Sequence, residues 1–493
     1  MSAKISENKV SRRHYVKYAG GAVVVVAAAA AGYGIFEGTK PSTTTQTPTT
    51  TILSTSTESW WEKAAAPYRG TELLMVGEEL APLEALAEIS PEFEKETGIA
   101  VKIEFLAEEE VFQKTMMDMV GKSGIYSMIQ GVHYNFGTFV EPGFLTPVDG
   151  MLKSDLAFPE LDQSDFMQRP WKNTCFYDKE THKYGEGDCY GLLFTTHCMF
   201  TWYRKDLFTH PEEQANFRAR YGYDIPINGP KTWKQYSDLA EFFTRKTGEK
   251  LAGETLENNF YGTLLQAKKH PALWYEWMNF QSSFGGKSFD ENGVIAIDSA
   301  ESVKALEYYV SLLPFCLPGV SAYTWDEALT AMQQGIVAMC IMWCDSTFDV
   351  EDPEQSQVAG KMGYCLTPEE EEGQNRPRCV YGGYSWYIPV SSKNPEAAFL
   401  FIQWASTKEN SKRMALLGGV PGRVSTWDDP DVLKLPYGQT QKDASKVAVF
   451  SPCGPHALKQ LDTLTLALSN AVLGEMTPRA ALSWCTDQWK AIG

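Results

Sequence analysis

The stretch VYGGYSWYIPVSSKNPEAAFLFIQWAS, residues 380–406, decides the interpretation of the chain because a short aromatic strand leads directly into an apolar helix. Successive side chains of a strand point to opposite faces. Tyr384 and Trp386 would then share one face, and Tyr387 would lie on the other. We expect Trp386 and Tyr387 to pack in a core.

Two adjacent glycines, Gly382 and Gly383, begin this segment. Glycine inside a strand weakens it and often marks the close approach of a ligand. We therefore expect Gly382, Gly383 and Tyr384 to form the floor of a ligand-binding cleft.

The first part of the folded chain alternates between strands and amphipathic helices. TELLMVG (71–77), AVKIEFLA (100–107) and YSMIQGV (126–132) have the composition of short strands, and the segments between them repeat apolar side chains at helical spacing. This order predicts a parallel sheet with helices on its faces. Ligands of such sheets bind at the carboxyl ends of the strands, which points to the loops after Val76 and Gln130.

Later segments continue the α/β pattern. Residues 230–249 contain a capping candidate, Thr232, and then repeat apolar side chains every three or four positions. Residues 324–343 predict a helix that stops at Gly335 and turns into a buried strand. Further amphipathic helices are expected at 299–314, 395–406 and 478–492.

Length and charge limit the classes of protein. A chain of 493 residues is too long for one small domain and suggests two or more lobes. The net charge is −18, and residues 1–59 are basic on balance, so the folded part is more acidic still. An acidic surface repels phosphate backbones, and we expect no nucleic-acid partner. Aromatic residues make up 13% of the chain, which suits flat ligands such as sugar rings.

The N-terminal part predicts an export signal, an anchor and a stalk. SRRHYVK, at the end of the basic segment 1–17, resembles a twin-arginine export signal. The apolar segment 18–36 is about long enough to span a bilayer. A Thr- and Ser-rich linker, 37–66, follows and cannot bury a core. Because a stalk is useful only when its base is fixed, we expect this segment to hold the protein at the extracellular face of the cytoplasmic membrane; release after signal cleavage is the alternative.

The cysteines predict disulfides. None of the ten forms a C-x-x-C pair, which excludes zinc-ribbon and thioredoxin-like sites. Cys175 with Cys189, and Cys365 with Cys379, bracket short polar loops, and a bridge across such a loop would stabilise the fold by roughly 3 kcal/mol. An even count in an exported chain favours such bridges. The remaining cysteines have no partner that the sequence assigns: Cys198, Cys316, Cys340, Cys344, Cys453 and Cys485.

Several blocks of sequence, in order, resemble those of the family 1 extracellular solute-binding proteins of ABC importers, the group that includes maltose-binding protein. The blocks are EFEKETGIAVKIEF, EPGFLTPVD, CYGLLFTTHCMFTWYRKDLF, PKTWKQY, ALTAMQQGIVAMCIMW and GGYSWYIPVSSKNPEAAFLFIQW. Each block is a weak signal alone, whereas their order over residues 70–493 is specific. The resemblance implies an α/β fold of two lobes, each a sheet flanked by helices, joined by crossover strands that form a hinge.

By this resemblance, lobe one comprises residues 67–188 and 370–428, and lobe two comprises residues 189–369 and 429–493. The ligand is held in the cleft between the lobes, which close on it. Both cysteine pairs fall near the crossovers, where bridges would stiffen the hinge loops.

Lobe one is expected to offer three ligand loops. Glu78 and Glu79 follow the first strand, where carboxylates can accept hydrogen bonds from sugar hydroxyls; acidic side chains favoured at a helix N-terminus are an equal explanation. His133, Tyr134 and Asn135 match the ligand loop of the family, with Tyr and Asn where maltose-binding protein has an acid and a base. The Gly-Gly-Tyr segment described above is the third loop.

Lobe two is expected to offer residues from two strands. Thr195 and His197 lie on the crossing strand, where the family often places a polar contact. Trp343 and Asp345 follow the buried strand, where relatives place a stacking aromatic and a polar partner. Arg423 matches a family position near the cleft. The alternatives are core packing for His197 and Trp343, and an acidic partner for Arg423.

The resemblance implies a protein that captures a sugar or oligosaccharide and delivers it to the permease subunits of an ABC transporter. Pyranose faces stack on Trp or Tyr, while hydroxyls need dense polar partners. We expect a monomer without cofactor or metal. We also expect no catalytic residue, since the chain has no G-x-S-x-G, P-loop or H-E-x-x-H motif. The alternatives are a peptide, polyol phosphate or polyamine as the solute, a sugar-binding surface adhesin, and a glycosidase with paired carboxylates.

Overall fold

A computed structural model describes residues 58–376 and 378–492 of the chain. The predicted twin-arginine segment, the apolar segment and most of the Thr-rich linker lie outside these residues. Within them, no helix is both long and apolar enough to cross a membrane.

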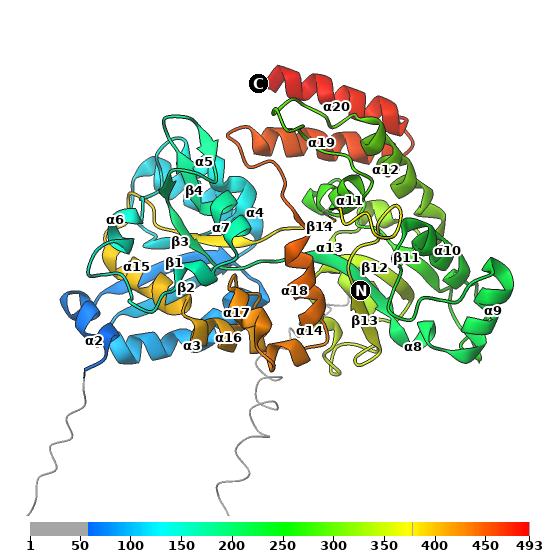
Figure 1. Cartoon of the computed structure of the whole chain (residues 1–493), viewed down its shortest axis with the longest axis horizontal. Coiled ribbons are helices and arrows are strands. Elements are labelled where there is room, and N and C mark those ends of the chain that lie inside the picture. The colour runs from blue at the N-terminus through cyan, green and yellow to red at the C-terminus, as the bar shows by residue number, and fades with distance from the viewer. Residues whose placement is uncertain (1–57, 377, 493) are drawn as a thin grey trace, which may run out of the picture. The chain divides into compact units, whose positions relative to one another are not determined.

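The first sheet has five strands in the order β2-β1-β3-β15-β7 (Figure 1). Strands β1 (Glu72–Glu78), β2 (Ala100–Leu106) and β3 (Met128–Val132) run parallel, which confirms the predicted parallel arrangement. Strand β15 (Tyr384–Tyr387) pairs antiparallel with β3 and with β7 (Gly191–Leu193). An aromatic strand from late in the chain is therefore inserted beside the N-terminal strands.

Helices α3 (Ala81–Thr97) and α4 (Glu108–Gly121) connect the parallel strands of this sheet. The apolar face of α3 is buried, and the helix ends at Gly98, whose φ of 73° is left-handed. Glycine adopts that conformation without the Cβ penalty of other residues, so it ends the helix cleanly.

The second sheet has four strands in the order β11-β12-β8-β13. Strand β12 (Val337–Trp343) runs parallel to β11 (Tyr261–Leu264) and antiparallel to β8 (Met199–Arg204), which also pairs with β13 (Met362–Cys365). The side chains of β12 are buried from Val337 to Met342, which accounts for its continuous apolar sequence.

The predicted helix signals near this sheet are confirmed. Helix α10 (Trp233–Phe243) begins after Thr232, which forms a capping box with Gln235. Helix α13 (Trp325–Gln333) ends just before Gly335, whose φ is 69°, and the chain then enters β12.

Among the described residues, three chain segments connect the two sheets. Residues 194–198 run between β7 and β8, and the other two segments contain β14 (Cys379–Val380) and β16 (Ala448–Val449). β14 pairs in parallel with β16, and Cys198 forms a β-bridge with Tyr381. The segments are thus hydrogen-bonded to one another between the sheets (Figure 1), which is the arrangement of a two-lobed protein with a hinge.

One strand lies on the other side of the expected lobe boundary. The sequence assigns residues 189–369 to lobe two, but β7 pairs with β15 in the first sheet. The chain completes that sheet before it crosses at residues 194–198.

The remaining elements surround the two sheets. The other helices are α2 (Trp60–Ala65), α5 (Phe136–Val140), α6 (Asp149–Leu152), α7 (Gln168–Cys175), α8 (Lys205–Phe208), α9 (Pro211–Tyr221), α11 (Pro271–Ser283), α12 (Ala300–Ser311), α14 (Thr347–Val350), α15 (Pro395–Ala405), α16 (Lys408–Leu416), α17 (Val424–Asp428), α18 (Gly438–Lys446), α19 (Ala457–Val472) and α20 (Pro478–Ile492). The short strands are β4 (Phe176–Asp178), β5 (Lys183–Tyr184), β6 (Asp188–Cys189), β9 (Lys250–Leu251) and β10 (Glu254–Thr255).

The expectation that Trp386 and Tyr387 belong to the core is confirmed, since both side chains are buried. The Trp386 ring lies 3.8 Å from that of Phe194, and the Tyr387 ring stacks on Phe136 at 5.6 Å between centroids. Strand β15 thereby fixes the first sheet to the segment that crosses between the sheets.

The predicted linker ends earlier than expected. Trp60 is the first residue of the folded unit, and α2 begins there. The Trp61 side chain is buried and stacks on Phe158 with 4.6 Å between ring centroids. Residues 60–66 therefore belong to the folded body, because two tryptophans give this segment an apolar face that it can bury.

The two expected disulfides are not formed. All ten cysteines, which lie within the described residues, are free thiols. Burial raises the pKa of Cys175 to about 12 and that of Cys365 to about 12. The thiol of Cys189 donates to the carbonyl oxygen of Gly191 at 3.2 Å. Buried, protonated and hydrogen-bonded thiols are poor nucleophiles, so these cysteines act as packing residues.

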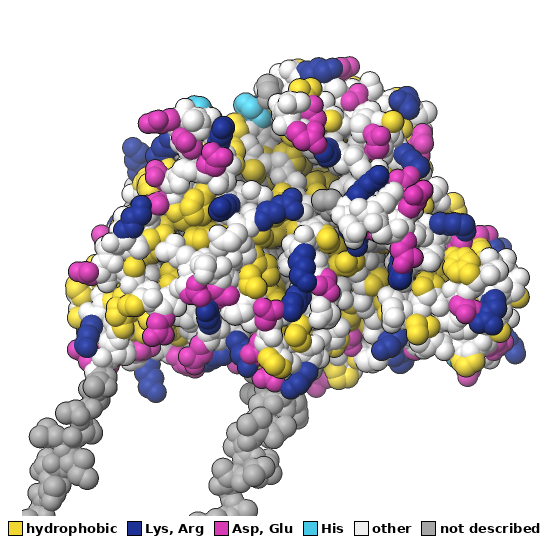
Figure 2. All heavy atoms as spheres, viewed as in Figure 1, with side chains coloured by type: hydrophobic (Ala, Val, Ile, Leu, Met, Phe, Trp, Pro, Cys, Tyr) yellow, Lys and Arg dark blue, Asp and Glu magenta, His cyan; other side chains and the backbone are white. Residues whose placement is uncertain are grey.

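Acidic and basic side chains are mixed over the molecular face shown in Figure 2, and hydrophobic side chains gather there only in small groups. Such a face is typical of a solvated surface. The buried polar groups described next therefore differ from the side chains of this solvated surface.

Candidate ligand-binding cleft

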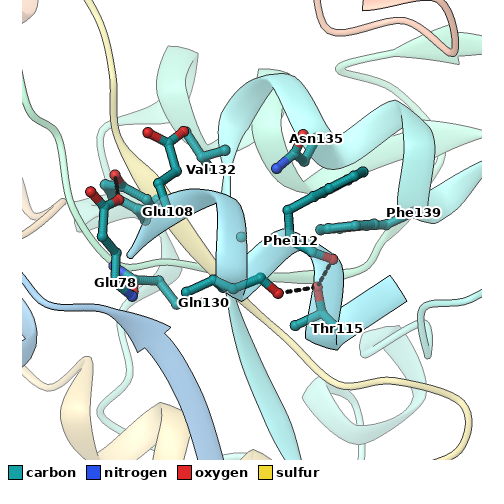
Figure 3. A pocket seen from close by; sticks show the side chains of 11 residues that line it. Glu78, Glu108, Phe112, Thr115, Gln130, Val132, Asn135 and Phe139 are labelled. Atoms are coloured by element: carbon teal, nitrogen blue, oxygen red, sulfur yellow. Dashed lines mark hydrogen bonds between the residues drawn. The ribbon is translucent and has the colours of Figure 1, made fainter. Parts of the chain in front are cut away.

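Two adjoining cavities lie where the two sheets meet. The larger has a volume of about 60 Å³ and is lined by Glu78, Leu80, Glu108, His197, Tyr275, Trp325, Trp343, Asp345, Ser346, Gly382 and Tyr384. The smaller, of about 10 Å³, shares Glu78, Glu108 and Tyr384 with it (Figure 3). Glu78 ends β1 and Trp343 ends β12, so the position agrees with the rule that ligands bind at the carboxyl ends of the strands.

Glu78 is held by two other residues of the first sheet. Its backbone N–H donates to Oε1 of Gln130 at 2.7 Å, and its carboxylate accepts a hydrogen bond from the Tyr384 hydroxyl. Burial raises the pKa of Glu78 well above its ordinary value, and repulsion from Glu108 adds to the shift. The carboxyl group is therefore poised for a partner that stabilises its charge.

Glu108 is the first residue of α4, and its carboxylate lies near that of Glu78 (Figure 3). It accepts a hydrogen bond from the Tyr134 hydroxyl. Burial raises the pKa of Glu108 to about 7, with repulsion from Glu109 in the same direction and the Tyr134 hydrogen bond opposing them. The site thus holds two neighbouring carboxyl groups, each paired with a neutral phenol.

A polar chain from the crossing segment reaches the second sheet. The Thr195 hydroxyl accepts from the Tyr384 backbone N–H at 3.0 Å and lies 3.0 Å from Nδ1 of His197. The other ring nitrogen of His197, Nε2, is 3.6 Å from a carboxylate oxygen of Asp345. Burial lowers the pKa of His197, although Asp345 acts in the opposite direction, so that the imidazole is neutral at neutral pH.

Aromatic rings form the remaining wall of the larger cavity. The rings of Trp343 and Tyr275 meet edge to face with 4.9 Å between centroids. A Cβ atom built on Gly382 would lie 2.4 Å from Cη2 of Trp343. Gly382 is therefore required where the Trp343 ring approaches the backbone most closely.

The structure brings together six of the residues that the sequence proposes for the site: Glu78, His197, Trp343, Asp345, Gly382 and Tyr384. Asn135 lines the smaller cavity, and Tyr134 reaches the site through Glu108. Thr195 supports Tyr384 and His197 from behind.

The other proposed residues do not line the cavities. Glu79 is exposed, and the space beside Gly383 is filled by Tyr381 and the backbone of Thr195. His133 is buried, with Nε2 2.7 Å from the Ser451 hydroxyl, and burial lowers its pKa to about 3. These three residues serve the surface or the packing around the hinge.

Arg423 is a structural residue. Its buried guanidinium pairs with Asp165 at 3.1 Å and also donates to the carbonyl oxygen of Leu161. It lies over the ring of Phe166, 4.3 Å from the centroid. All of these partners lie in or beside loops of the first lobe. The alternative explanation, that Arg423 pairs with an acidic side chain, is therefore correct.

Five residues of the larger cavity were missed: Leu80, Glu108, Tyr275, Trp325 and Ser346. Glu108 had a usable signal, because it stands two residues after the last residue of β2, at the carboxyl end of a parallel strand. Tyr275 and Trp325 lie in α11 and α13, where apolar spacing gives no sign of a cavity.

The site offers hydrogen-bond acceptors and aromatic faces. Within residues 58–376 and 378–492, no cluster of His, Cys, Asp and Glu side chains is arranged to hold a metal ion. Two α/β sheets joined by hydrogen-bonded connections, with a cavity lined from both, define a two-lobed solute-binding protein. The chain belongs to the family described as bacterial extracellular solute-binding protein, whose profile matches residues 77–412.

Relatives agree with this assignment. A "Probable amino-acid ABC transporter periplasmic-binding protein" of Sinorhizobium fredii is 25% identical over 386 residues, 77% of this chain and 80% of the relative. A "Mannitol-binding protein" of Pseudomonas aeruginosa is 28% identical over 368 residues, 72% of this chain and 74% of the relative.

Solved structures show the same fold. An ABC transporter solute-binding protein of Agrobacterium radiobacter in complex with ribitol superposes with a TM-score of 0.70 at 24% identity, covering 86% of this chain and 99% of the other. One from Agrobacterium vitis with bound D-mannitol gives 0.67 at 23% identity, covering 85% and 98%.

Proposed function

We propose that this chain is the extracytoplasmic binding component of an ABC transporter and that it captures a small sugar or polyol between its two sheets. The observation that carries the proposal is a single cavity in which carboxylates and aromatic rings converge from both sheets. Carboxylates accept hydrogen bonds from hydroxyls, and aromatic rings cover the apolar faces of a sugar.

The size of the cavity favours a small solute over an oligosaccharide. A water molecule needs about 10–15 Å³ of such volume, so a cavity of about 60 Å³ corresponds to a few waters. The mannitol-binding relative and the ribitol and D-mannitol complexes support a ligand of this size.

The same proposal covers the setting of the protein. It acts as a monomer at the extracellular face of the cytoplasmic membrane after twin-arginine export, held by its N-terminal segment. Residues 60–188 and 370–428, together with β7, form one lobe, and residues 194–369 and 429–492 form the other. Closure on the solute presents a shape that permease subunits recognise, and no reaction is catalysed.

A thermal-shift screen of the full chain tests this function. A ligand that binds only the native state raises the melting temperature by mass action. D-mannitol, ribitol, D-glucose, maltose, a dipeptide and putrescine form the panel, and we expect at least one sugar or polyol to raise it. A rise with the dipeptide or putrescine alone would mean that the solute class is wrong.

The variant Trp343→Ala tests the site itself. We expect it to weaken the binding of the best ligand by about 1–3 kcal/mol, by analogy with the range for a nucleobase that stacks on an aromatic ring. Trp484→Ala, in α20 and away from both cavities, is the matched control and should leave affinity unchanged. Equal ligand affinities of the two variants would mean that Trp343 contributes only to packing.

A further inference from the structure

The cleft has an unbalanced charge. Glu78, Glu108 and Asp345 line the larger cavity, and Glu109 acts electrostatically on the first two. Among the described residues, neither cavity is lined by a Lys or Arg side chain. The His197 imidazole is neutral for the reason given above, so no group of the protein offsets these acids within the cavity.

The hydrogen-bond partners of the acids are neutral as well. Glu78 accepts from Tyr384, and Glu108 accepts from Tyr134. Taking like charges out of water together is costly unless a positive charge joins them. A solute that supplies a positive charge would turn this repulsion into attraction, whereas with a neutral solute the carboxyl groups relieve it only by binding protons.

The aromatic walls suit the same charge. Tyr275, Trp325 and Trp343 line the cavity that contains the acids. A cation near an aromatic face is attracted by the ring, most strongly when it is desolvated. Acids and rings together therefore favour an ammonium group.

A separate observation concerns buried polar atoms at the cleft that have no hydrogen-bond partner. Nε2 of Gln130, Oδ1 of Asn135 and Nε2 of His197 make no hydrogen bond, although these residues are only 2%, 5% and 3% exposed. Gln130 and Asn135 line the smaller cavity (Figure 3), and His197 lines the larger one. Buried polar atoms nearly always have partners, so these atoms mark positions where a ligand supplies donors and acceptors.

We propose that the solute is a small hydroxylated molecule with a protonated amino group, an amino sugar or an amino polyol. The proposal rests on the proposed function, because it names the solute class for the same cleft. Its ammonium group lies among Glu78, Glu108 and Asp345, and its hydroxyls pair with the unpartnered atoms of Gln130, Asn135 and His197.

Matched ligand pairs test the proposal by calorimetry on the full chain. D-glucosamine differs from D-glucose, and glucamine from sorbitol, by one ammonium group in place of a hydroxyl. We expect at least one amino compound to bind about tenfold more tightly than its neutral counterpart, a difference of about 1.4 kcal/mol.

The outcomes separate the two proposals. Neutral members that bind as tightly as the amino members would overturn the charged-solute proposal and leave solute binding intact. Putrescine binding without any hydroxylated amine would overturn it as well, since the hydroxyls are part of it. If no sugar, polyol or amine binds, the proposed function itself fails.

Charge-neutral variants locate the effect. Glu78→Gln and Glu108→Gln keep the shape of the side chain, and we expect each to reduce the preference for the amino member at least about fivefold, a difference of about 1 kcal/mol. Glu110→Gln, on the same helix but exposed, is the control and should keep the preference. A preference unchanged in both cleft variants contradicts the proposal.

Proton release provides a measurement on the unaltered protein. Glu78 faces Glu108, Glu109, Asp345 and the phenol of Tyr384, and Glu108 faces Glu109 and the phenol of Tyr134. The phenol of Tyr275 lies beside both acids. An ammonium group beside these carboxyls lowers their pKa, so binding of glucamine near about pH 6.5 releases protons, whereas binding of sorbitol does not. Calorimetry in two buffers of different ionisation enthalpy measures the release, and an equal release for both ligands would contradict the placement.

Discussion

The backbone at Gly382 passes so close to the Trp343 ring that no other residue fits without displacing it. We expect Gly382→Ala to move this ring, weaken ligand binding at least about tenfold and lower the free energy of unfolding by about 1–3 kcal/mol, as overpacking does. Gly150→Ala is the control, since a Cβ there meets no atom within 4 Å. Titration calorimetry and denaturant unfolding give the two values; normal affinity in the Gly382 variant would show that the ring can shift without loss.

A second prediction at this scale concerns Glu108 and pH. Its pKa is about 7 in the folded protein against an ordinary value of 4.5, so the folded state binds more protons between these values. The contribution of Glu108 to the free energy of unfolding therefore falls as pH rises from about 4.5 to about 7, by about 1–3 kcal/mol, and is constant above.

Denaturant unfolding at pH 4.5, 6 and 8 checks this sign by comparison of variants. Relative to the unaltered protein, Glu108→Gln should gain stability as pH rises over this window. Glu110→Gln, exposed on the same helix, should follow the unaltered protein at every pH. Parallel curves for all three proteins would mean that Glu108 is ionised normally in the fold.

How far the sequence predicts the site depends on what each residue contacts. Glu78 and Trp343 could be placed because each ends a strand with a clear pattern. Glu108 also follows a parallel strand, but this signal was not used, since acids at the start of a helix are common for electrostatic reasons alone. Arg423 was proposed as a ligand-binding residue because its partner Asp165 is distant in sequence, and no local pattern predicts that ion pair.

At the scale of elements, helices with caps were predictable and inserted strands were not. Thr232 with Gln235 announces α10, and Gly98 announces the end of α3. The position of β15 between β3 and β7 depends on pairing between segments far apart in sequence, which local periodicity does not contain. The same limit explains why α2 was taken for linker.

Helix α2 provides a prediction of its own. Because Trp61 is 8% exposed and stacks on Phe158, we expect Trp61→Ala to lower the free energy of unfolding by about 2–4 kcal/mol, near the range for buried aromatic truncation. Lys63→Ala, exposed on the same helix, should change it by less than about 0.5 kcal/mol. Chemical unfolding of both variants measures the difference. Equal free energies of unfolding would show that α2 is part of the linker and not of the folded body.

At the scale of the whole molecule, the two-lobed arrangement was predicted through the family resemblance, whereas its boundaries needed the structure. The lobes meet through three hydrogen-bonded connections, and the solute site lies beside them. Thr195 and His197 belong to one of these connections and also to the network of the site. The proposed binding site and the connections between the lobes therefore share these residues.

The reactivity of the cysteines provides a prediction for the whole folded part of the chain. Their thiols are spread over both sheets and the connections, and burial raises the pKa of every one of them, for example to about 11 at Cys453. We expect slow reaction with a chromogenic thiol reagent in the native state and reaction of all ten thiols after unfolding without reductant. Spectrophotometric titration counts them. A count of eight or fewer would show that the protein as isolated contains bridges.

The pairing of Tyr384 with Glu78, and of Tyr134 with Glu108, has a consequence for selectivity. Each phenol already donates to one carboxylate oxygen that a solute could use, so that acceptor on each acid is satisfied by a side chain of the protein. A solute gains affinity only when its donors outcompete these resident hydroxyls. Water and weak donors gain nothing from the exchange, and the two tyrosines thus set a threshold that a transported molecule must exceed.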